Sequence, residues 1–443
     1  MIGEGEGTVE RRARMVWTMK TDQPRLARPE RHQHVLEDCC LDTQLSADHR
    51  ARQVWAFVEG VDVGPLEDKV GSRPGRAGAP AISPRLLLAL WLYACLDGVG
   101  SARELSRLCE EHVAYRWLCG RVGVNHHTLS DFRGSSGPFL DGLLSDMIAA
   151  LVKAGVVDGS TIFQDGTKVR ASAGSASFRR GATLRKLRAQ AAAHVAAVKA
   201  QPSDQALSAR VRAARQRAAR ERLERIDAAL GTMDGLRRAR ASVPHDPRRQ
   251  SELRASTTDS DARVMKTRGG GRDAAYNVQL ATDARSRAIV GVQLVQKGAD
   301  NGLSEEMRPE VERRTGVKVR THITDAGYLS KPTVEREAAA GVERIMPLPI
   351  GRDGKPGIDS QPGDGPGVHA WRERMRTRRA KELLRQRSGI AETPNAELKA
   401  HRALDRLLVR GLAKTTSVIL LGAIVYNLMH FAGVLVGRPM PPL

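Results

Sequence analysis

The chain has 443 residues, 41% hydrophobic and 27% charged, which fits a soluble globular protein with two or three domains. Lysine and arginine number 71 against 50 aspartates and glutamates, and this net charge of +21 predicts a polyanionic partner, by default nucleic acid. The five cysteines include no CxxC pair, which argues against a zinc domain and fits a reducing cytoplasm. The first residues lack the continuous apolar run of a signal peptide.

The N-terminal third is patterned for helices. Residues 1–31 are charged and poorly patterned, so we expect a basic flexible leader there. From residue 35 to residue 140 the apolar spacing predicts a small all-helical domain. Its expected helices cover residues 45–58, 86–96, 102–112, 115–118 and 126–133. Such a domain fits the placement of a helix in a DNA groove, and it equally fits a packing or dimerisation module.

A strand with an unexpected acid follows at Ser160–Arg170. The run Thr161–Phe163 consists of β-formers, yet Asp165 stands in the middle of the strand. A carboxylate on an apolar strand is costly to desolvate unless it is paired or holds a cation. Taken alone, such an acid is most often a strand-end or surface residue.

The next segment, residues 183–245, has a different character. Between residues 183 and 242 it holds 14 lysines and arginines against 5 acids, with much alanine and no aromatic residue. Apolar residues at helical spacing predict a helical hairpin with a basic outer face. We expect Arg212, Arg215 and Arg222 to contact a DNA backbone, and the alternative is a solvated helix pair without a partner.

Strand patterns then resume and set the fold class. Residues 276–282 and 288–295 predict a hairpin, a helix begins at 304, and the strand 319–324 ends at Asp325. A further helix, a strand at 343–348 and a Gly/Pro-rich loop follow. This order indicates an α/β fold with a ribonuclease H-like mixed sheet flanked by helices, within residues 151–436. The N-terminal all-α domain and the inserted helical hairpin are added to that sheet.

A third acid, Glu392, follows a basic helix. Arg385, Glu392 and Lys399 stand seven residues apart, so a continuous helix would place them on one stripe. Together, Asp165, Asp325 and Glu392 predict the three ligands of a divalent-metal site. Carboxylates of this kind suit Mg²⁺ or Mn²⁺.

Pro394 complicates the position of this third acid. Proline disfavours helical geometry in the residue before it, so the helix is kinked there or a new helix starts with Pro394 in its first turn. Glu397 and Glu382 are therefore alternatives to Glu392 as the third ligand.

The segment 418–436 is apolar over almost the length of a membrane span. It contains Asn427 and His430, which would be costly in lipid. We expect a buried core helix, with Ile419, Leu420, Ile424 and Leu428 in the core. A transmembrane span is the alternative.

Over residues 35–432 the sequence resembles bacterial insertion-sequence transposases of the DDE type. The matching motifs are Gln164–Lys168, Gly269–Gly271, Tyr276–Gln279, Thr324–Tyr328, Arg385, Arg387, Ile390, Glu392, Lys399 and Arg410–Lys414. The N-terminal part matches through Trp91–Tyr93, Ser101–Arg103 and Thr128–Arg133. One departure is Leu384, which stands where the family often has an aromatic residue.

The resemblance implies that Asp165, Asp325 and Glu392 are a catalytic metal-binding triad. It also implies that Arg387 and Lys399 hold substrate phosphates, with Arg385 and Lys168 as further DNA-binding residues. The implied activity cuts double-stranded DNA at element ends and joins it to target DNA. Two Mg²⁺ or Mn²⁺ ions would serve both steps.

This resemblance further predicts a homo-oligomer on DNA, in the cytoplasm and associated with the nucleoid, with no membrane partner and no small-molecule cofactor. The helical domain would then bind DNA ends or mediate dimerisation. Three alternatives stay open: an inactive DNA-binding derivative, a metal-dependent nuclease without strand transfer, and a membrane-associated protein.

Overall fold

The structure of the chain, a computed structural model, describes residues 40–72, 79–200, 208–241, 253–267, 270–350, 357, 359 and 361–437. The predicted leader at residues 1–31 lies outside these ranges, as does Gly269 of the glycine motif. Leu41–Leu443 belong to one unit, separate from Met1–Cys40.

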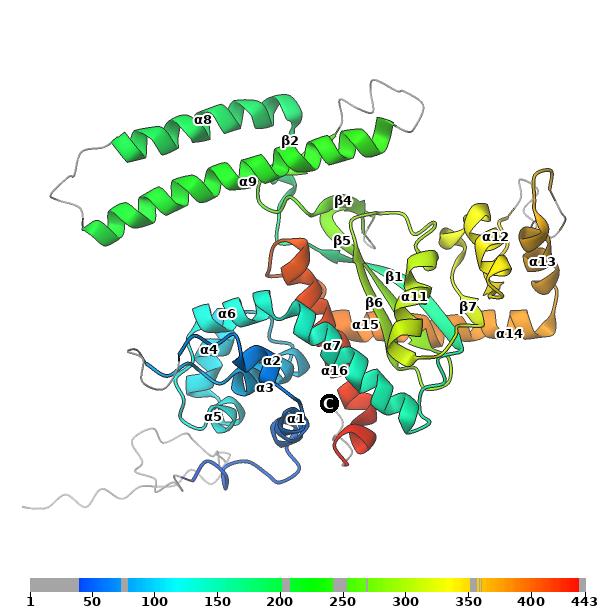
Figure 1. The fold of residues 1–443 in the computed structure, drawn as a ribbon, viewed down its shortest axis with the longest axis horizontal. Coiled ribbons are helices and arrows are strands. Elements are labelled where there is room, and N and C mark those ends of the chain that lie inside the picture. Colours follow the sequence, from blue (N-terminus) through cyan, green and yellow to red (C-terminus); the bar gives the residue numbers. More distant parts are fainter. Residues whose placement is uncertain are drawn as a thin grey trace, which may run out of the picture. The chain divides into compact units, whose positions relative to one another are not determined.

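The N-terminal part is helical, as its apolar spacing predicts (Figure 1). The first helix begins at Arg50 rather than at residue 45, because the His49 side chain accepts the free N–H of Ala51 and caps it there. Every residue from Leu86 to Leu96 is buried, since this run is apolar on all faces. The helices are α1 (Arg50–Glu59), α2 (Gly64–Glu67), α3 (Pro84–Leu96), α4 (Ala102–Glu111), α5 (Val113–Cys119), α6 (His126–Ser135) and α7 (Gly137–Lys153).

Helix α7 is the longest of the elements that the sequence did not predict. It crosses residues 140–151, the interval between the two predicted domains, and packs against α16 (Leu412–Leu435). One hydrophobic core draws on the N-terminal helices, the sheet and α16. The predicted boundary between a helical domain and a sheet domain stays a prediction.

The central sheet has the mixed order that the strand pattern predicts. Strands β5 (Arg272–Asp283) and β6 (Ile289–Val295) form the antiparallel hairpin, and β5 lies antiparallel to β1 (Thr161–Arg170). On the other side of β1 lie β7 (Thr321–Ile323) and then β8 (Glu343–Ile345), both parallel to it. The order β6–β5–β1–β7–β8 therefore places β1 in the middle. This helix-flanked mixed sheet is ribonuclease H-like, so the predicted fold class is confirmed.

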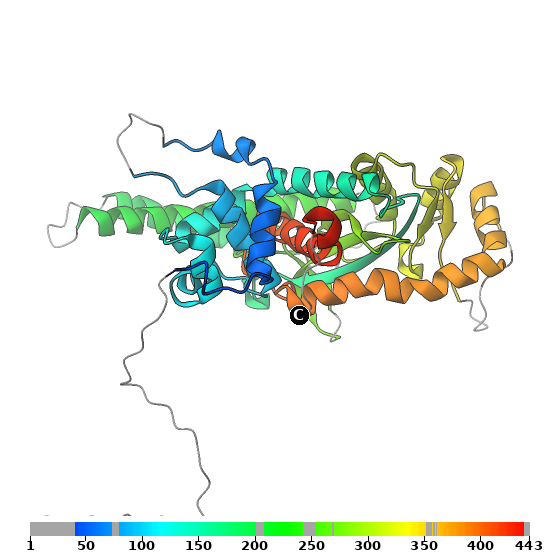
Figure 2. The ribbon, with the colours of Figure 1, turned by 90° about the horizontal axis from the view of Figure 1, so that it is seen from below.

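Five helices and two short helical turns lie between β6 and α16 in the described part of the chain. They are α11 (Ser304–Thr315), the short turn η2 (Ala326–Tyr328), α12 (Lys331–Ala339), α13 (Pro366–Arg374), α14 (Arg378–Arg387), η3 (Ser388–Glu392) and α15 (Thr393–His401). Figure 2 shows α14, η3 and α15 following one another along one line. The middle piece, η3, is a single π-helical turn, and it packs on β1.

The arginine-rich segment forms a helical hairpin of α8 (Gly181–Ala200) and α9 (Ala209–Ala241), side by side in Figure 1. Short strands β2 (Phe178–Arg180) and β3 (Arg254–Ser256) pair at its base, after the turn η1 (Ser175–Ser177). Another short strand, β4 (Arg263–Lys266), then pairs with the start of β5. The hairpin is held by a small apolar cluster made of Leu184, Ala229, Met233, Leu253 and Ala255.

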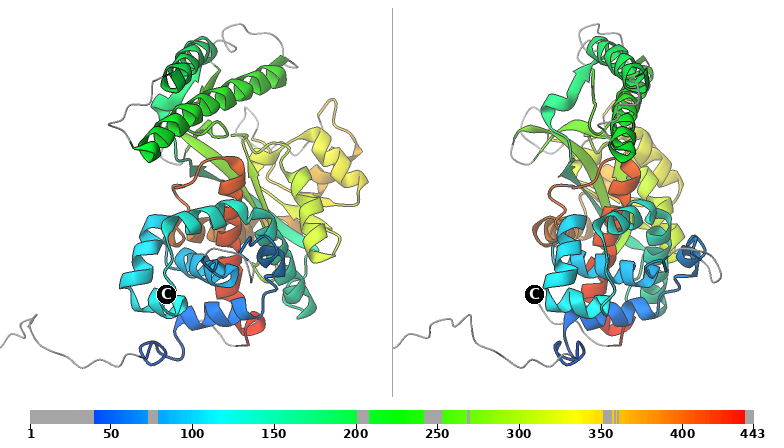
Figure 3. Two further views of the ribbon diagram at one scale, coloured as in Figure 1. Left: turned by 60° about the vertical axis from the view of Figure 1, so that its left-hand side comes forward. Right: turned by 90° about the vertical axis from the view of Figure 1, so that its left-hand side faces the viewer.

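Helix α16 is the buried C-terminal helix that the sequence predicts, and Figure 3 shows it running between the N-terminal helices and the sheet. Asn427 both donates to and accepts from the backbone of Ile289, each at 2.9 Å, so its polar groups are paired in the core. The helix has the length and hydropathy of a membrane span, but 61% of its 18-residue apolar window is buried within the protein. These contacts are those of a core helix. The predicted core residues are each at most 2% exposed: Ile419, Leu420, Ile424 and Leu428.

Candidate active site

Asp165 lies in the middle of β1, two residues after the fully buried Phe163. Its half-buried side chain borders a cavity. Burial raises the pKa of Asp165 to about 6, and the nearby carboxylates of Asp325 and Glu392 raise it as well, against the opposing effect of the Arg387 guanidinium. A carboxylate whose ionised form is disfavoured in this way gains from a bound cation.

Asp325 lies beside Asp165 because of the sheet register. Strands β1 and β7 run parallel with Phe163 opposite Ile323, so each aspartate stands two residues past the same pair. The Asp325 carboxylate accepts the backbone N–H of Gly327 at 2.8 Å, which holds it at the start of η2. The parallel strand order thus brings together two acids that are far apart in the sequence.

Glu392 is the last residue of the π-helical turn η3. Its Oε1 lies 3.1 Å from Nη2 of Arg387, forming an ion pair at the rim of the cavity. These two residues are five positions apart, which is the spacing that a π-helical turn places on one face. In an α-helix the same two side chains would point about 140° apart.

Pro394 accounts for the π-helical turn. Proline has no N–H for the carbonyl four residues earlier, and its ring would clash with that carbonyl in an α-helix. The wider turn avoids this clash, and side chains satisfy neighbouring carbonyls: Thr393 Oγ1 donates to Gly389 at 2.9 Å and Asn395 Nδ2 to Ala391 at 3.2 Å. Pro394 lies in the first turn of α15, which is one of the two predicted outcomes, but Thr393 keeps helical backbone geometry (φ −58°, ψ −50°), contrary to the prediction.

The π-helical turn also changes which basic residues reach the site. Arg387 and Lys399 line the cavity, whereas Arg385 does not. The Arg385 side chain is 77% exposed and pairs with Glu382 outside the cavity. The prediction that Arg385, Glu392 and Lys399 share one face is wrong for Arg385. The π-helical turn η3 interrupts the α-helical spacing on which that prediction depends.

Glu397, the other alternative to Glu392, contacts different partners. Its Oε1 accepts from Nη2 of Arg402 at 2.9 Å, and its Oε2 lies 3.0 Å from Nε2 of His430. Burial acts to raise the pKa of Glu397, but these two partners outweigh it and lower the pKa. Glu397 is not among the residues that line the cavity, and Glu392 is.

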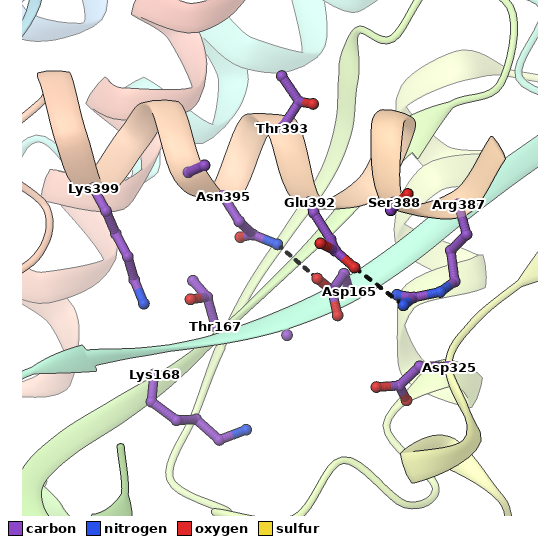
Figure 4. A pocket seen from close by; sticks show the side chains of 12 residues that line it. Asp165, Thr167, Lys168, Asp325, Arg387, Ser388, Glu392, Thr393, Asn395 and Lys399 are labelled. Carbon is purple, nitrogen blue, oxygen red and sulfur yellow. Dashed lines mark hydrogen bonds and ion pairs between the residues drawn. The ribbon is translucent and has the colours of Figure 1, made fainter. Parts of the chain in front are cut away.

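One cavity of about 520 Å³ gathers acids and cations from distant parts of the chain. Figure 4 shows the three carboxylates and Arg387 toward one end, with the two lysines toward the other. Such a lining offers oxygen ligands to a cation and positive charge to phosphates. The charged residues that line it are Asp165, Lys168, Asp325, Arg387, Glu392 and Lys399.

The donors in this cavity have the chemistry of a Mg²⁺ or Mn²⁺ site, since they are carboxylate and amide oxygens. Oδ1 of Asn395 is a buried acceptor without a hydrogen-bond partner, as expected of an atom that awaits a ligand. Within the described ranges, no three His, Cys, Asp or Glu side chains lie close enough to hold a metal ion as they stand. The carboxylates would have to rotate toward one another to share an ion.

Asn395 is a residue of this site that the sequence analysis missed. It is 6% exposed, and its Nδ2 donates to Oδ2 of Asp165 at 3.3 Å. The available signal was its spacing, because Asn395 follows Glu392 by three residues and therefore lies on the same helix face.

The predicted DNA-binding residues fall into two groups. Lys168 lines the cavity, and its Nζ donates to the Asp300 carboxylate at 3.0 and 3.2 Å. Arg212, Arg215 and Arg222 lie on α9, away from the lining of the cavity. Arg215 and Arg222 are exposed and seven residues apart, so they share one face of that helix, while Arg212 is half-buried.

Two families of known proteins match the chain. The family described as Transposase domain (DUF772) matches residues 39–135, and the family described as Transposase DDE domain matches residues 250–428. Together they cover more than half of the chain and include Asp325 and Glu392, whereas Asp165 lies between the two matches. No curated protein and no solved structure matches the chain.

Proposed function

Because the chain belongs to the DDE transposases of insertion sequences, we propose that Asp165, Asp325 and Glu392 are its catalytic carboxylates. The protein would cut double-stranded DNA at the ends of its element and join the freed 3′ ends to target DNA by metal-dependent phosphoryl transfer. One observation carries this proposal. Acids from β1, from the turn after β7 and from η3 border a single cavity together with three cations.

The three carboxylates would hold Mg²⁺ or Mn²⁺, with two ions as the proposed number. When bound, such ions supply the activation of the attacking water or 3′-hydroxyl and the stabilisation of the leaving 3′ oxygen. Asn395 would orient the Asp165 carboxylate through the hydrogen bond that its Nδ2 donates to Oδ2. The pKa of Asp165 is raised because burial and the nearby carboxylates disfavour its ionised form, and a bound cation would stabilise that form.

Lys168, Arg387 and Lys399 would hold phosphate oxygens beside the scissile bond. The planar guanidinium of Arg387 suits two parallel hydrogen bonds to one phosphate. Its ion pair with Glu392 keeps it at the rim of the cavity, where a phosphate would compete for it.

Outside the cavity, the phosphates of the DNA would contact exposed lysine and arginine side chains. On α14, Arg378, Lys381 and Arg385 are all exposed and lie within two turns of helix. On α9 the corresponding exposed residues are Arg215 and Arg222, with the half-buried Arg212 one turn before Arg215. Contacts of this kind are made to phosphates and add affinity for any sequence.

The test is a reaction with labelled DNA that carries the ends of the element, together with unlabelled target DNA. We expect cleavage and joining in Mg²⁺ or Mn²⁺ but not in Ca²⁺ or EDTA, because Ca²⁺ prefers larger and looser coordination. Asp165→Ala, Asp325→Ala and Glu392→Ala should each abolish both steps and keep DNA binding. Glu382→Ala, an exposed acid of α14, is the matched control and should keep both steps.

Each other outcome would change the proposal in a defined way. Cleavage without joining would make the protein a nuclease, and binding without cleavage would make it an inactive derivative. Near-normal cleavage by Glu392→Ala, with none by Glu397→Ala, would move the third carboxylate to Glu397.

A further inference from the structure

A buried polar network lies beside the cavity, and its centre is Gln279 on β5. This residue belongs to the motif Tyr276–Gln279, to which the proposed chemistry gives no role. The side chains of Gln279, Gln164, Asn277 and His322 are all fully buried, although each is polar. Four buried polar side chains next to a catalytic strand need an explanation beyond filling space.

All four hydrogen-bonding positions of the Gln279 amide are used. Nε2 donates to Asn277 Oδ1 at 3.1 Å and to Asp300 Oδ1 at 2.9 Å. Oε1 accepts from Gln164 Nε2 at 2.8 Å and from the hydroxyl of Tyr328. A carboxylate only accepts, so Asp300 fixes which way the Gln279 amide points.

The network reaches the cavity at two places. Asp300 also accepts from Nζ of Lys168, a residue that lines the cavity. Tyr328 is the last residue of η2, the turn that begins directly after Asp325. A single side chain, Gln279, is therefore linked both to the β1 wall of the cavity and to the turn that carries Asp325.

Gly166 shows how closely the network is packed against the catalytic strand. It stands opposite Gln279 in the register of β1 and β5. A Cβ atom at position 166 would lie 2.3 Å from Gln279 Nε2 and 2.8 Å from Asp300 Oδ1. A larger residue next to Asp165 would therefore displace one or both of these side chains from the strand.

We propose that Gln279 is a positioning residue. Its hydrogen bonds fix the positions of Lys168 and of the turn after Asp325 relative to Asp165. The carboxylates would then be held in a single arrangement for binding a metal ion. This inference rests on the proposed function. Apolar side chains at all of these positions would avoid burying polar groups, so stability alone does not account for the network. A buried amide whose hydrogen bonds are all made specifies a single arrangement of its partners, which is what a catalytic site needs.

The test replaces Gln279 by methionine, which has a similar length and makes none of these hydrogen bonds. We expect the dissociation constant for Mn²⁺, measured by calorimetry on the full chain, to rise about tenfold to a hundredfold. The cleavage rate at saturating DNA should fall by a similar factor. Tyr328→Phe removes one hydrogen bond and keeps the ring, and it should weaken Mn²⁺ binding about fivefold. This milder variant decides the question if Gln279→Met does not fold.

Asn427→Leu is the matched control, because Asn427 is also a fully buried amide with paired hydrogen bonds, but its partner is the Ile289 backbone and not a group linked to the cavity. It should lower the melting temperature and leave Mn²⁺ affinity unchanged. Folded Gln279→Met and Tyr328→Phe proteins with wild-type Mn²⁺ affinity and cleavage would overturn the inference and leave the proposed function intact. A wild-type chain that neither binds Mn²⁺ nor cleaves DNA would overturn both.

Discussion

Helices α9 and α16 are long helices of 33 and 24 residues that the chain uses in opposite ways. In α16 most residues are buried, and even Asn427 is paired inside the core. Among the described side chains of α9, only Ala219, Ile226, Ala229 and Met233 are buried, and arginine is the most frequent residue at the exposed positions. We therefore expect fold stability and affinity for DNA to depend on different helices. Each property should respond to substitutions in one helix and not in the other.

The largest effect is expected from Ile424→Asp in α16. Ile424 is fully buried, so the change would place an unpaired carboxylate in the core. We expect insoluble or protease-sensitive protein, measured by fractionation and limited proteolysis. Val434→Asp, at a position of the same helix that is 47% exposed, is the control and should stay folded. A soluble and active chain truncated at Thr416 would contradict the role given to α16 and would reopen the membrane interpretation.

A smaller effect on stability is expected from the ionisation of Asp165. Its side chain is half-buried, between the buried residues of α16 and the exposed arginines of α9. Its pKa in the folded chain, about 6, is above the ordinary value of 3.8. The folded state therefore binds the proton more tightly, so Asp165 favours folding at low pH. This contribution should disappear as pH rises from about 4 to about 6, on the order of 2 kcal/mol.

Thermal unfolding at a series of pH values in EDTA measures this contribution. Asp165→Asn, which cannot ionise, should remove it and flatten the dependence of the melting temperature between pH 4 and pH 6. An identical pH dependence in both proteins would show that Asp165 ionises freely in the folded chain.

The smallest effect on stability is expected in α9. Reversing the charges of Arg215 and Arg222 to glutamate should change the free energy of unfolding by no more than about 0.5 kcal/mol, because both side chains are exposed. The slope of log affinity for DNA against log salt should flatten by about 0.9 for each phosphate that the variant no longer neutralises. Arg212→Glu should flatten it too and should also affect folding, since Arg212 is half-buried.

Arg215→Lys keeps the charge and is the control for the slope, which it should leave unchanged. A salt slope that does not respond to the charge reversals would return the hairpin to the alternative of a solvated helix pair.

Much of the fold was predictable because hydrophobic periodicity is a local property. The apolar runs of β1, of the β5–β6 hairpin and of α16 identify these elements without any knowledge of their neighbours. The two aspartates were predictable for the same reason, since each follows or interrupts such a run. Helix α7 was missed because it falls in the interval taken as a boundary between domains.

The rest of the site depends on how segments meet. The stripe through Arg385 assumed regular α-helical spacing, whereas Pro394 is accommodated by a π-helical turn that shifts the register. The network of Gln279 joins Gln164, Asp300 and Tyr328, which come from separate segments of the chain. No periodicity in the sequence predicts such contacts, because they arise only when the sheet has assembled.

The most direct test of the central claim is the affinity of the full chain for Mn²⁺, measured by calorimetry without DNA. If Asp165, Asp325 and Glu392 form one metal site, alanine at any of the three should raise the dissociation constant at least about tenfold. Glu382→Ala should leave it unchanged. Wild-type affinity in all three variants, or an equal rise in the Glu382 control, would contradict the assignment of these carboxylates as the metal-binding centre of the transposase.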